Sequence, residues 1–73
     1  MNNLQTIEAV KAALPNINFE NIESEYGGFA AVTYSKDQHR QFMKAASNSE
    51  DLAICKGEFL FDFKHVTQRI KLH

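Results

Sequence analysis

The side chains of this sequence that could bind a metal ion or act in nucleophilic catalysis are three histidines and one cysteine: His39, His65, His73 and Cys55. A structural zinc site needs four ligands, which usually arrive in closely spaced pairs. The sequence contains no such pair, so we expect no metal site and no cofactor. Cys55 lies in the apolar stretch LAICK, residues 52–56, and a buried cysteine of this kind is normally unreactive. We therefore expect no catalytic residue and no enzymatic activity; a small enzyme that uses Cys55 or a histidine is the third hypothesis, after protein binding and nucleic-acid binding.

The octapeptide KGEFLFDF, residues 56–63, contains three phenylalanines that are two residues apart. It resembles the Lys-Gly-aromatic-x-aromatic motif of RNA-recognition and cold-shock domains, whose rings stack on bases. The sequence departs from that motif at Glu58, which replaces the first aromatic residue, and at Asp62, which lies between the last two rings. Carboxylates at these positions would repel phosphates. An RNA-recognition domain also begins with a strand, whereas this chain begins with a predicted helix.

The alternation of residue types in this octapeptide favours a strand that holds its rings in the protein core. We expect Phe59, Phe61 and Phe63 to point inward and their polar neighbours to point outward. Leu60 interrupts the polar side, so it is either covered by another element or contacts a partner. Both the predicted architecture and the preference for a protein partner depend on this buried placement of the three rings.

Two segments have the apolar spacing of a helix. Residues 4–14 form the first, and Pro15 ends it because proline lacks a backbone donor and disfavours a helical conformation in the preceding residue. Residues 35–38, Ser-Lys-Asp-Gln, have the capping-box pattern, in which the serine accepts a hydrogen bond from the third following N–H. The second helix is expected to continue to about Ala46, with a narrow apolar stripe that contains Phe42.

A β-hairpin is predicted between these helices. Gly27-Gly28 is a strong two-residue turn signal, since both residues adopt positive φ angles without strain. The change of alternation phase near Glu20 and Asn21 indicates a turn or bulge. A two-residue turn would pair Tyr26 with Phe29, Ser24 with Ala31 and Ile22 with Thr33.

The last third of the chain is apolar and resembles β-structure. We expect a short strand over residues 52–56, a turn at Lys56-Gly57 and a second strand up to Phe63. Residues 64–72 alternate like a half-buried strand, although a helix that starts near Asp62 also fits the apolar spacing. We favour the strand, because valine, threonine and isoleucine prefer strands and because a third strand would cover the edge of the phenylalanine-rich one.

Charge is distributed unevenly along a chain whose net charge is −1. Residues 1–35 contain one basic and four acidic residues, whereas residues 36–73 contain seven basic and five acidic ones. The near-neutral total argues against a dedicated basic nucleic-acid binder. The uneven distribution predicts an acidic hairpin and a basic C-terminal segment, provided that folding does not mix them.

The N-terminal residues lack the basic and apolar regions of a signal peptide, and no apolar run approaches the ~18 residues of a membrane span. The lone cysteine cannot form an internal disulfide, which fits a reducing compartment. We therefore expect a cytoplasmic protein that does not enter a membrane. A chain of 73 residues also buries a modest core, which a homodimer would extend.

These elements predict a single α+β domain over residues 1–73, arranged as helix–β-hairpin–helix–β-hairpin with or without an extra C-terminal strand. The strands would form an antiparallel sheet with the helices packed on one face. No sequence feature predicts a second domain or an internal repeat.

The favoured function is that of a small non-enzymatic protein-binding module that inhibits or regulates a larger protein, as many accessory proteins of phages and mobile elements do. Its contact surface would include Glu23 and Glu25 on the acidic hairpin, together with Leu60. The alternative is nucleic-acid binding by the basic C-terminal strand, in a monomer or a dimer, through Lys64, Arg69 and Lys71.

Overall fold

The computed structural model describes residues 3–72, which form two α-helices, a short 3-10 helix and four strands. Their order along the chain is α1 (Asn3–Ala13), β1 (Phe19–Glu25), β2 (Phe29–Ser35), η1 (Lys36–Gln38), α2 (His39–Ser47), β3 (Leu52–Phe61) and β4 (His65–Leu72). This order confirms the predicted α+β arrangement of helix, hairpin, helix and hairpin. Neither of the α-helices described is long and apolar enough to cross a membrane.

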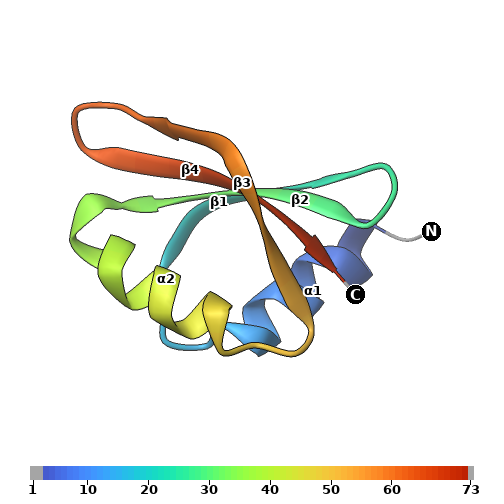
Figure 1. Ribbon diagram of the computed structural model, residues 1–73. Helices are drawn as coiled ribbons and strands as arrows, with labels where there is room; N and C mark the ends of the chain where they lie inside the picture. Colours follow the sequence, from blue (N-terminus) through green and yellow to red (C-terminus); the bar gives the residue numbers. More distant parts are fainter. Residues whose placement is uncertain (1–2, 73) are drawn as a thin grey trace.

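The four strands form one antiparallel sheet in the order β1-β2-β4-β3. β1 and β3 are therefore the two edge strands, and β2 and β4 lie between them. Figure 1 shows both helices on one side of the sheet, as the sequence predicts. We call the side away from α1 and α2 the open face.

The core lies between the sheet and the two helices. Its aromatic centre is Phe42 of α2, whose ring stacks on Tyr34 at 4.5 Å and meets the edge of Phe19 at 6.3 Å between ring centroids. Phe42 and Tyr34 are both fully buried. The helices, the segment between α1 and β1, and the alternating positions of the strands supply the other buried apolar side chains: Val10, Leu14, Ile17, Ala30, Val32, Ala46, Leu52, Val66 and Ile70.

The β1–β2 hairpin contains the predicted bulge but has a different register. The pairing shifts at Glu20, where the alternation changes phase. The turn contains three residues, because Tyr26 joins Gly27 and Gly28, whose φ angles are 88° and 83°. Each residue of β1 therefore lies opposite a residue of β2 that is one position earlier than predicted. A shift of one residue changes which side chains of the two strands share a face of the sheet. The observed pairs are Glu25 with Phe29, Ser24 with Ala30 and Ile22 with Val32.

The start of α2 differs in detail from the predicted capping box. Ser35 makes no side-chain hydrogen bond to the first N–H groups of the helix. Gln38 Nε2 instead donates to Ser35 Oγ at 3.3 Å and to the Asn18 carbonyl at 3.0 Å, while its Oε1 accepts from the Asn18 N–H at 2.8 Å. Gln38 therefore ties the beginning of α2 to the segment before β1.

The predicted turn at Lys56-Gly57 is wrong, because β3 runs without a turn from Leu52 to Phe61. Its pairing with β4 jumps from Ile54 opposite Ile70 to Phe59 opposite Gln68. Residues 55–58 form a large bulge at this jump, and Gly57 adopts a φ of 82° within it. A glycine with positive φ fits a bulge as well as a turn.

The chain reverses at residues 62–64 instead. Asp62 Oδ1 accepts hydrogen bonds from the backbone N–H of Lys64 at 2.8 Å and of His65 at 2.6 Å, which closes the turn. The strand predicted over residues 64–72 is confirmed as β4, from His65 to Leu72. It is the second strand of this hairpin and not an additional one.

The predicted burial of the three phenylalanine rings is also wrong. Phe59 is 46% exposed, Phe61 is 50% exposed and Phe63 is 90% exposed. Phe59 and Phe61 lie on the edge strand, and Figure 1 shows the end of the β3–β4 hairpin projecting away from the helices. The core is completed by residues such as Phe42 and Tyr34, so the α+β architecture does not depend on these rings. The preference for a protein partner, however, loses the basis that it had in the sequence, because that basis was the burial of these rings.

Candidate functional site

The exposed apolar side chains gather on the β3–β4 hairpin. Leu60 is 73% exposed, and its neighbours Phe59, Phe61 and Phe63 are exposed as described above. We call these four residues the apolar edge. Only one other large apolar side chain of the described chain is exposed to a similar degree, namely Tyr26 in the β1–β2 turn. Among the residues whose exposure is described, the apolar edge is therefore the main apolar surface.

The backbone of the apolar edge also has unpaired polar groups. The Asp62 N–H donates to the His65 carbonyl at 3.0 Å, which pairs these residues across the hairpin. In an antiparallel ladder, alternate residues direct their N–H and C=O groups toward the same neighbour. Leu60, two residues earlier, thus directs its backbone groups toward β4. Phe59 and Phe61 direct theirs toward the open edge of the sheet, where an additional strand could bind.

The side chains of the apolar edge lie on both faces of the sheet. Phe59 pairs with Gln68 and Phe61 pairs with Val66, which places both rings on the helix side, since Gln68 and Val66 are buried there. Leu60 pairs with Thr67 and lies on the open face. A strand added to this edge could therefore contact apolar side chains on both the helix side and the open face of the sheet.

The rings on the helix side are ordered by contacts with one another and with α2. The Phe59 and Phe61 rings meet edge to face at 5.2 Å, and Phe61 meets the His39 ring at the same distance. Lys36 Nζ lies 5.6 Å from the centre of the Phe61 ring. The Lys36 N–H also donates to the Lys64 carbonyl at 3.0 Å, which anchors the hairpin turn to the end of β2.

A cavity of about 240 Å³ lies between α2 and β3, next to the apolar edge. It is lined by His39, Met43, Ile54, Cys55, Lys56, Gly57, Phe59, Phe61 and Gln68. The bulge at residues 55–58 contributes Cys55, Lys56 and Gly57 to the wall of this cavity. Its size suits one or two apolar side chains better than a drug-sized ligand, which needs ~300 Å³ or more.

A chain of hydrogen bonds forms the polar part of the cavity wall. The Tyr34 hydroxyl lies 2.8 Å from His39 Nδ1, and Gln68 Nε2 donates to that hydroxyl at 3.4 Å and to Met43 Sδ at 3.3 Å. Gln68 is only 3% exposed. Burial raises the pKa of the Tyr34 hydroxyl above 10.0, against a smaller opposing effect of the Gln68 hydrogen bond. The hydroxyl therefore stays protonated at neutral pH and can keep both hydrogen bonds.

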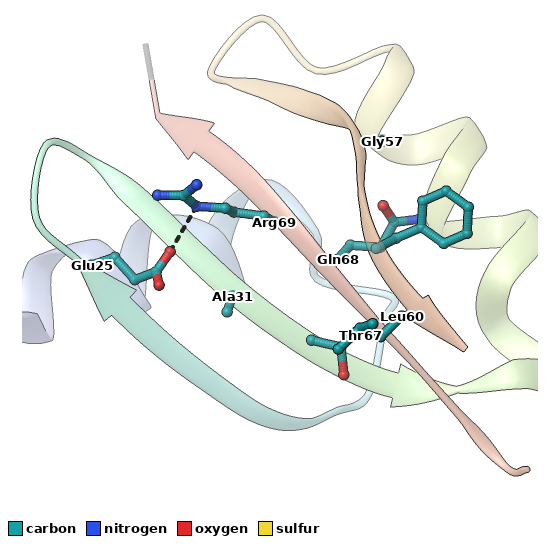
Figure 2. A pocket seen from close by; sticks show the side chains of 8 residues that line it. Glu25, Ala31, Gly57, Leu60, Thr67, Gln68 and Arg69 are labelled. Atoms are coloured by element: carbon teal, nitrogen blue, oxygen red, sulfur yellow. Dashed lines mark hydrogen bonds and ion pairs between the residues drawn. The ribbon is translucent and has the colours of Figure 1, made fainter. Parts of the chain in front are cut away.

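A second hollow of about 450 Å³ lies beside the same bulge and is shown in Figure 2. Gly57, Phe59 and Gln68 line both spaces. The second hollow also contains Leu60 of the apolar edge, together with Arg69, whose Nε lies 2.9 Å from Glu25 Oε1. The bulge thus produces an indented surface next to the residues that expose most apolar area.

The residues predicted for protein binding do not form one surface. Glu23 and Glu25 lie on β1, whereas Leu60 lies on β3, at the opposite edge of the sheet. Glu23 is exposed and lies opposite Ala31, and Glu25 forms an ion pair with Arg69. Of the three predicted residues, Leu60 is the one that lies within the exposed apolar surface.

The residues predicted for nucleic-acid binding are also separated. Arg69 and Lys71 lie on the open face over the Phe29 ring, at 4.3 Å and 5.4 Å from its centre. Lys64 lies in the hairpin turn, seven residues before Lys71, which corresponds to roughly 23 Å along a strand. Arg69 is also paired with Glu25, so these side chains do not form one continuous basic patch.

The side chains first considered for chemistry are dispersed as well. Cys55 is half-buried in the bulge and lines the cavity with His39, whereas His65 lies beside Glu20. His73 lies outside the described residues. Within the described residues, no three His, Cys, Asp or Glu side chains gather as metal ligands would.

Sequence reasoning did not find the cavity or the exposed edge. The sequence feature that could have indicated the bulge is Gly57 within an apolar strand, because glycine inside a strand often marks a bulge.

The chain matches no family model, no curated protein and no solved structure.

Proposed function

We propose that this protein is a small non-enzymatic protein-binding module that binds by adding a strand of another chain to its edge strand β3. The observation that supports this function is the apolar edge. Proteins normally shorten, charge or cover such strands, because an exposed apolar edge pairs readily with other chains. A contiguous apolar patch on a small protein is also typical of an interaction site.

The local geometry suits recognition by strand addition. In this mode, backbone hydrogen bonds provide affinity and pockets for alternate side chains provide specificity. Phe59 and Phe61 offer the backbone groups, and the cavity between α2 and β3 lies next to their rings. The bulge at residues 55–58 limits regular pairing to the distal part of β3.

A module of this size would act as an accessory, inhibitory or regulatory subunit in the cytoplasm. Glu23 and Glu25 are less suited to the contact than Leu60, because both lie on the opposite edge strand β1 and Glu25 is already paired with Arg69. Nucleic-acid binding is the weaker candidate. The Phe59 and Phe61 rings lie on the helix side of the sheet, away from Arg69 and Lys71.

Photo-crosslinking in the cells that produce the protein tests this function. The photoreactive residue p-benzoylphenylalanine is placed at Phe61, which is half-exposed, and in a control at Tyr26, which is fully exposed in the other hairpin. We expect a discrete protein adduct from position 61 and none from position 26. Adding Leu60→Lys should reduce the adduct about tenfold, because a charged edge residue opposes strand addition. If no discrete adduct forms at position 61, or if positions 61 and 26 give the same adducts, the proposal is contradicted.

A further inference from the structure

We infer that the chain bound at β3 is a second copy of this protein, which gives a twofold-symmetric dimer. The sheets would join through antiparallel pairing of the two β3 strands, with four strands contributed by each copy. This inference rests on the proposed function, because it uses the same edge and names the partner.

The direction of the backbone groups determines how two copies can pair. Phe59 and Phe61 direct their N–H and C=O groups outward, whereas Leu60 directs its groups toward β4. A twofold axis at Leu60 brings Phe59 of one copy opposite Phe61 of the other, and the reverse. Each such pair exchanges two backbone hydrogen bonds, as hydrogen-bonded pairs of an antiparallel ladder do.

The same axis brings like side chains together. The two Leu60 side chains meet on the open face, in the non-hydrogen-bonded position where Cα atoms are ~4.5 Å apart. On the helix side, each Phe59 ring lies next to the Phe61 ring of the other copy. Cross-strand aromatic and aliphatic pairs of this kind stabilise antiparallel sheets. The half-exposed rings of one copy are therefore covered by the half-exposed rings of the next.

The apolar area available fits a dimer. With ~200 Å² for each large side chain, the exposed fractions of the four apolar-edge residues correspond to on the order of 500 Å² of apolar surface per copy. Two copies would bury at most about 1,000 Å² of this surface, which reaches the lower bound for a specific interface. A 73-residue chain gains particularly from such burial, because its own core is small.

The mass of the protein in solution tests this inference first. Sedimentation equilibrium should give an average mass that approaches twice the 8.3 kDa chain mass as the concentration is raised to about 0.5 mM. Leu60→Lys should give the monomer mass at the same concentration, with unchanged circular dichroism. Tyr26→Lys is the matched control, because it charges a fully exposed residue in the other hairpin, and it should remain dimeric.

Disulfide trapping tests the register and does not depend on a destabilising substitution. The chain is first changed by Cys55→Ser, which removes its cysteine. In that background, Leu60→Cys should form a covalent dimer under mild oxidation, because the expected Cα separation lies within the range of 4.4–6.8 Å that disulfides need. Glu23→Cys on the opposite edge strand should give at least about tenfold less covalent dimer.

The outcomes separate this inference from the proposed function. A monomer mass up to about 0.5 mM for the unchanged chain, or equal trapping at positions 60 and 23, would overturn the dimer. If position 61 then photo-crosslinks to a protein of a different mass, the edge binds another partner and the proposed function stands. If position 61 forms no adduct, both proposals fail.

Discussion

Arg69 Nε lies 2.9 Å from Glu25 Oε1, which joins a residue predicted for nucleic-acid binding to one predicted for protein binding. Arg69 belongs to β4 and Glu25 belongs to β1, and the ion pair spans the intervening strand β2. The Arg69 guanidinium also lies 4.3 Å from the centre of the Phe29 ring. The sheet order therefore mixes the acidic hairpin with the basic C-terminal strand, and the charge separation along the chain is reduced in the folded protein.

Removing this ion pair should have a small effect on stability. Glu25→Gln should lower the free energy of unfolding by about 0.2–1 kcal/mol, because both side chains are partly exposed and solvent screens their attraction. A double-mutant cycle with Arg69→Gln, measured by urea denaturation, isolates the coupling. Glu23→Gln on the same strand serves as the control. A coupling energy of zero between Glu25 and Arg69 would show that the pair does not stabilise the sheet.

The buried and exposed phenylalanines should differ strongly in their contribution to stability. Phe42→Ala should cost about 3–5 kcal/mol, because this ring is fully buried against Tyr34. Phe61→Ala should cost less than about 1.5 kcal/mol, since half of its ring surface is already in water. Denaturant unfolding of dilute protein, which keeps the chain monomeric, gives both values. Equal losses would mean that the hairpin rings belong to the core.

Gly57 should be sensitive to substitution although it is exposed. Gly57→Ala should cost about 1–2 kcal/mol, because an L-residue is strained at its φ of 82°. A Cβ atom at this position would have no heavy atom within 4 Å outside the two adjacent residues, so the cost would come from the backbone and not from a steric clash. Gly57→Asn should recover part of the loss, since asparagine tolerates this conformation better. Thermal unfolding of the three proteins checks this prediction: the melting temperature should be highest with glycine at position 57, lower with asparagine and lowest with alanine.

Asp62 should make the hairpin sensitive to acid. The backbone N–H groups of His65 and Lys64 hold the pKa of the Asp62 carboxyl below its ordinary value of 3.8. A carboxyl whose folded-state pKa is depressed stabilises the fold above its unfolded-state pKa, and this stability is lost as the pH falls through the folded-state value. The stability difference between the unchanged protein and Asp62→Asn should therefore shrink as the pH falls below about 4.

Melting temperatures of both proteins, measured from neutral pH down to about pH 2, provide this comparison. Asp51→Asn is a suitable control, because this aspartate is exposed and lies in the loop between α2 and β3. A difference between the unchanged protein and Asp62→Asn that stays constant over the whole pH range would contradict the prediction.

Local sequence signals gave most of the secondary structure. Pro15 ends α1 because the restriction that it places on the preceding residue acts within the chain itself. The alternation over residues 64–72 produces β4, and the phase change near Glu20 produces a bulge. The helix–hairpin–helix–hairpin order follows from these signals, because each concerns residues close together in the chain.

Gly57 shows where local signals were insufficient. A glycine with positive φ is compatible with a tight turn and with a bulge, and its neighbours in sequence do not distinguish them. The pairing of Ile54 with Ile70 and of Phe59 with Gln68 selects the bulge. Asp62 then closes the turn, because its carboxylate accepts from two backbone N–H groups.

The sequence by itself determined that this protein is α+β and that Phe59 and Phe61 share one side of a strand, since both follow from the spacing of residue types. Only the tertiary structure decided whether that side is covered. The strand order β1-β2-β4-β3 puts β3 at an edge, and Phe42 and Tyr34 complete the core without the hairpin rings. Burial depends on which distant segments pack together, and no spacing along a single strand contains that information.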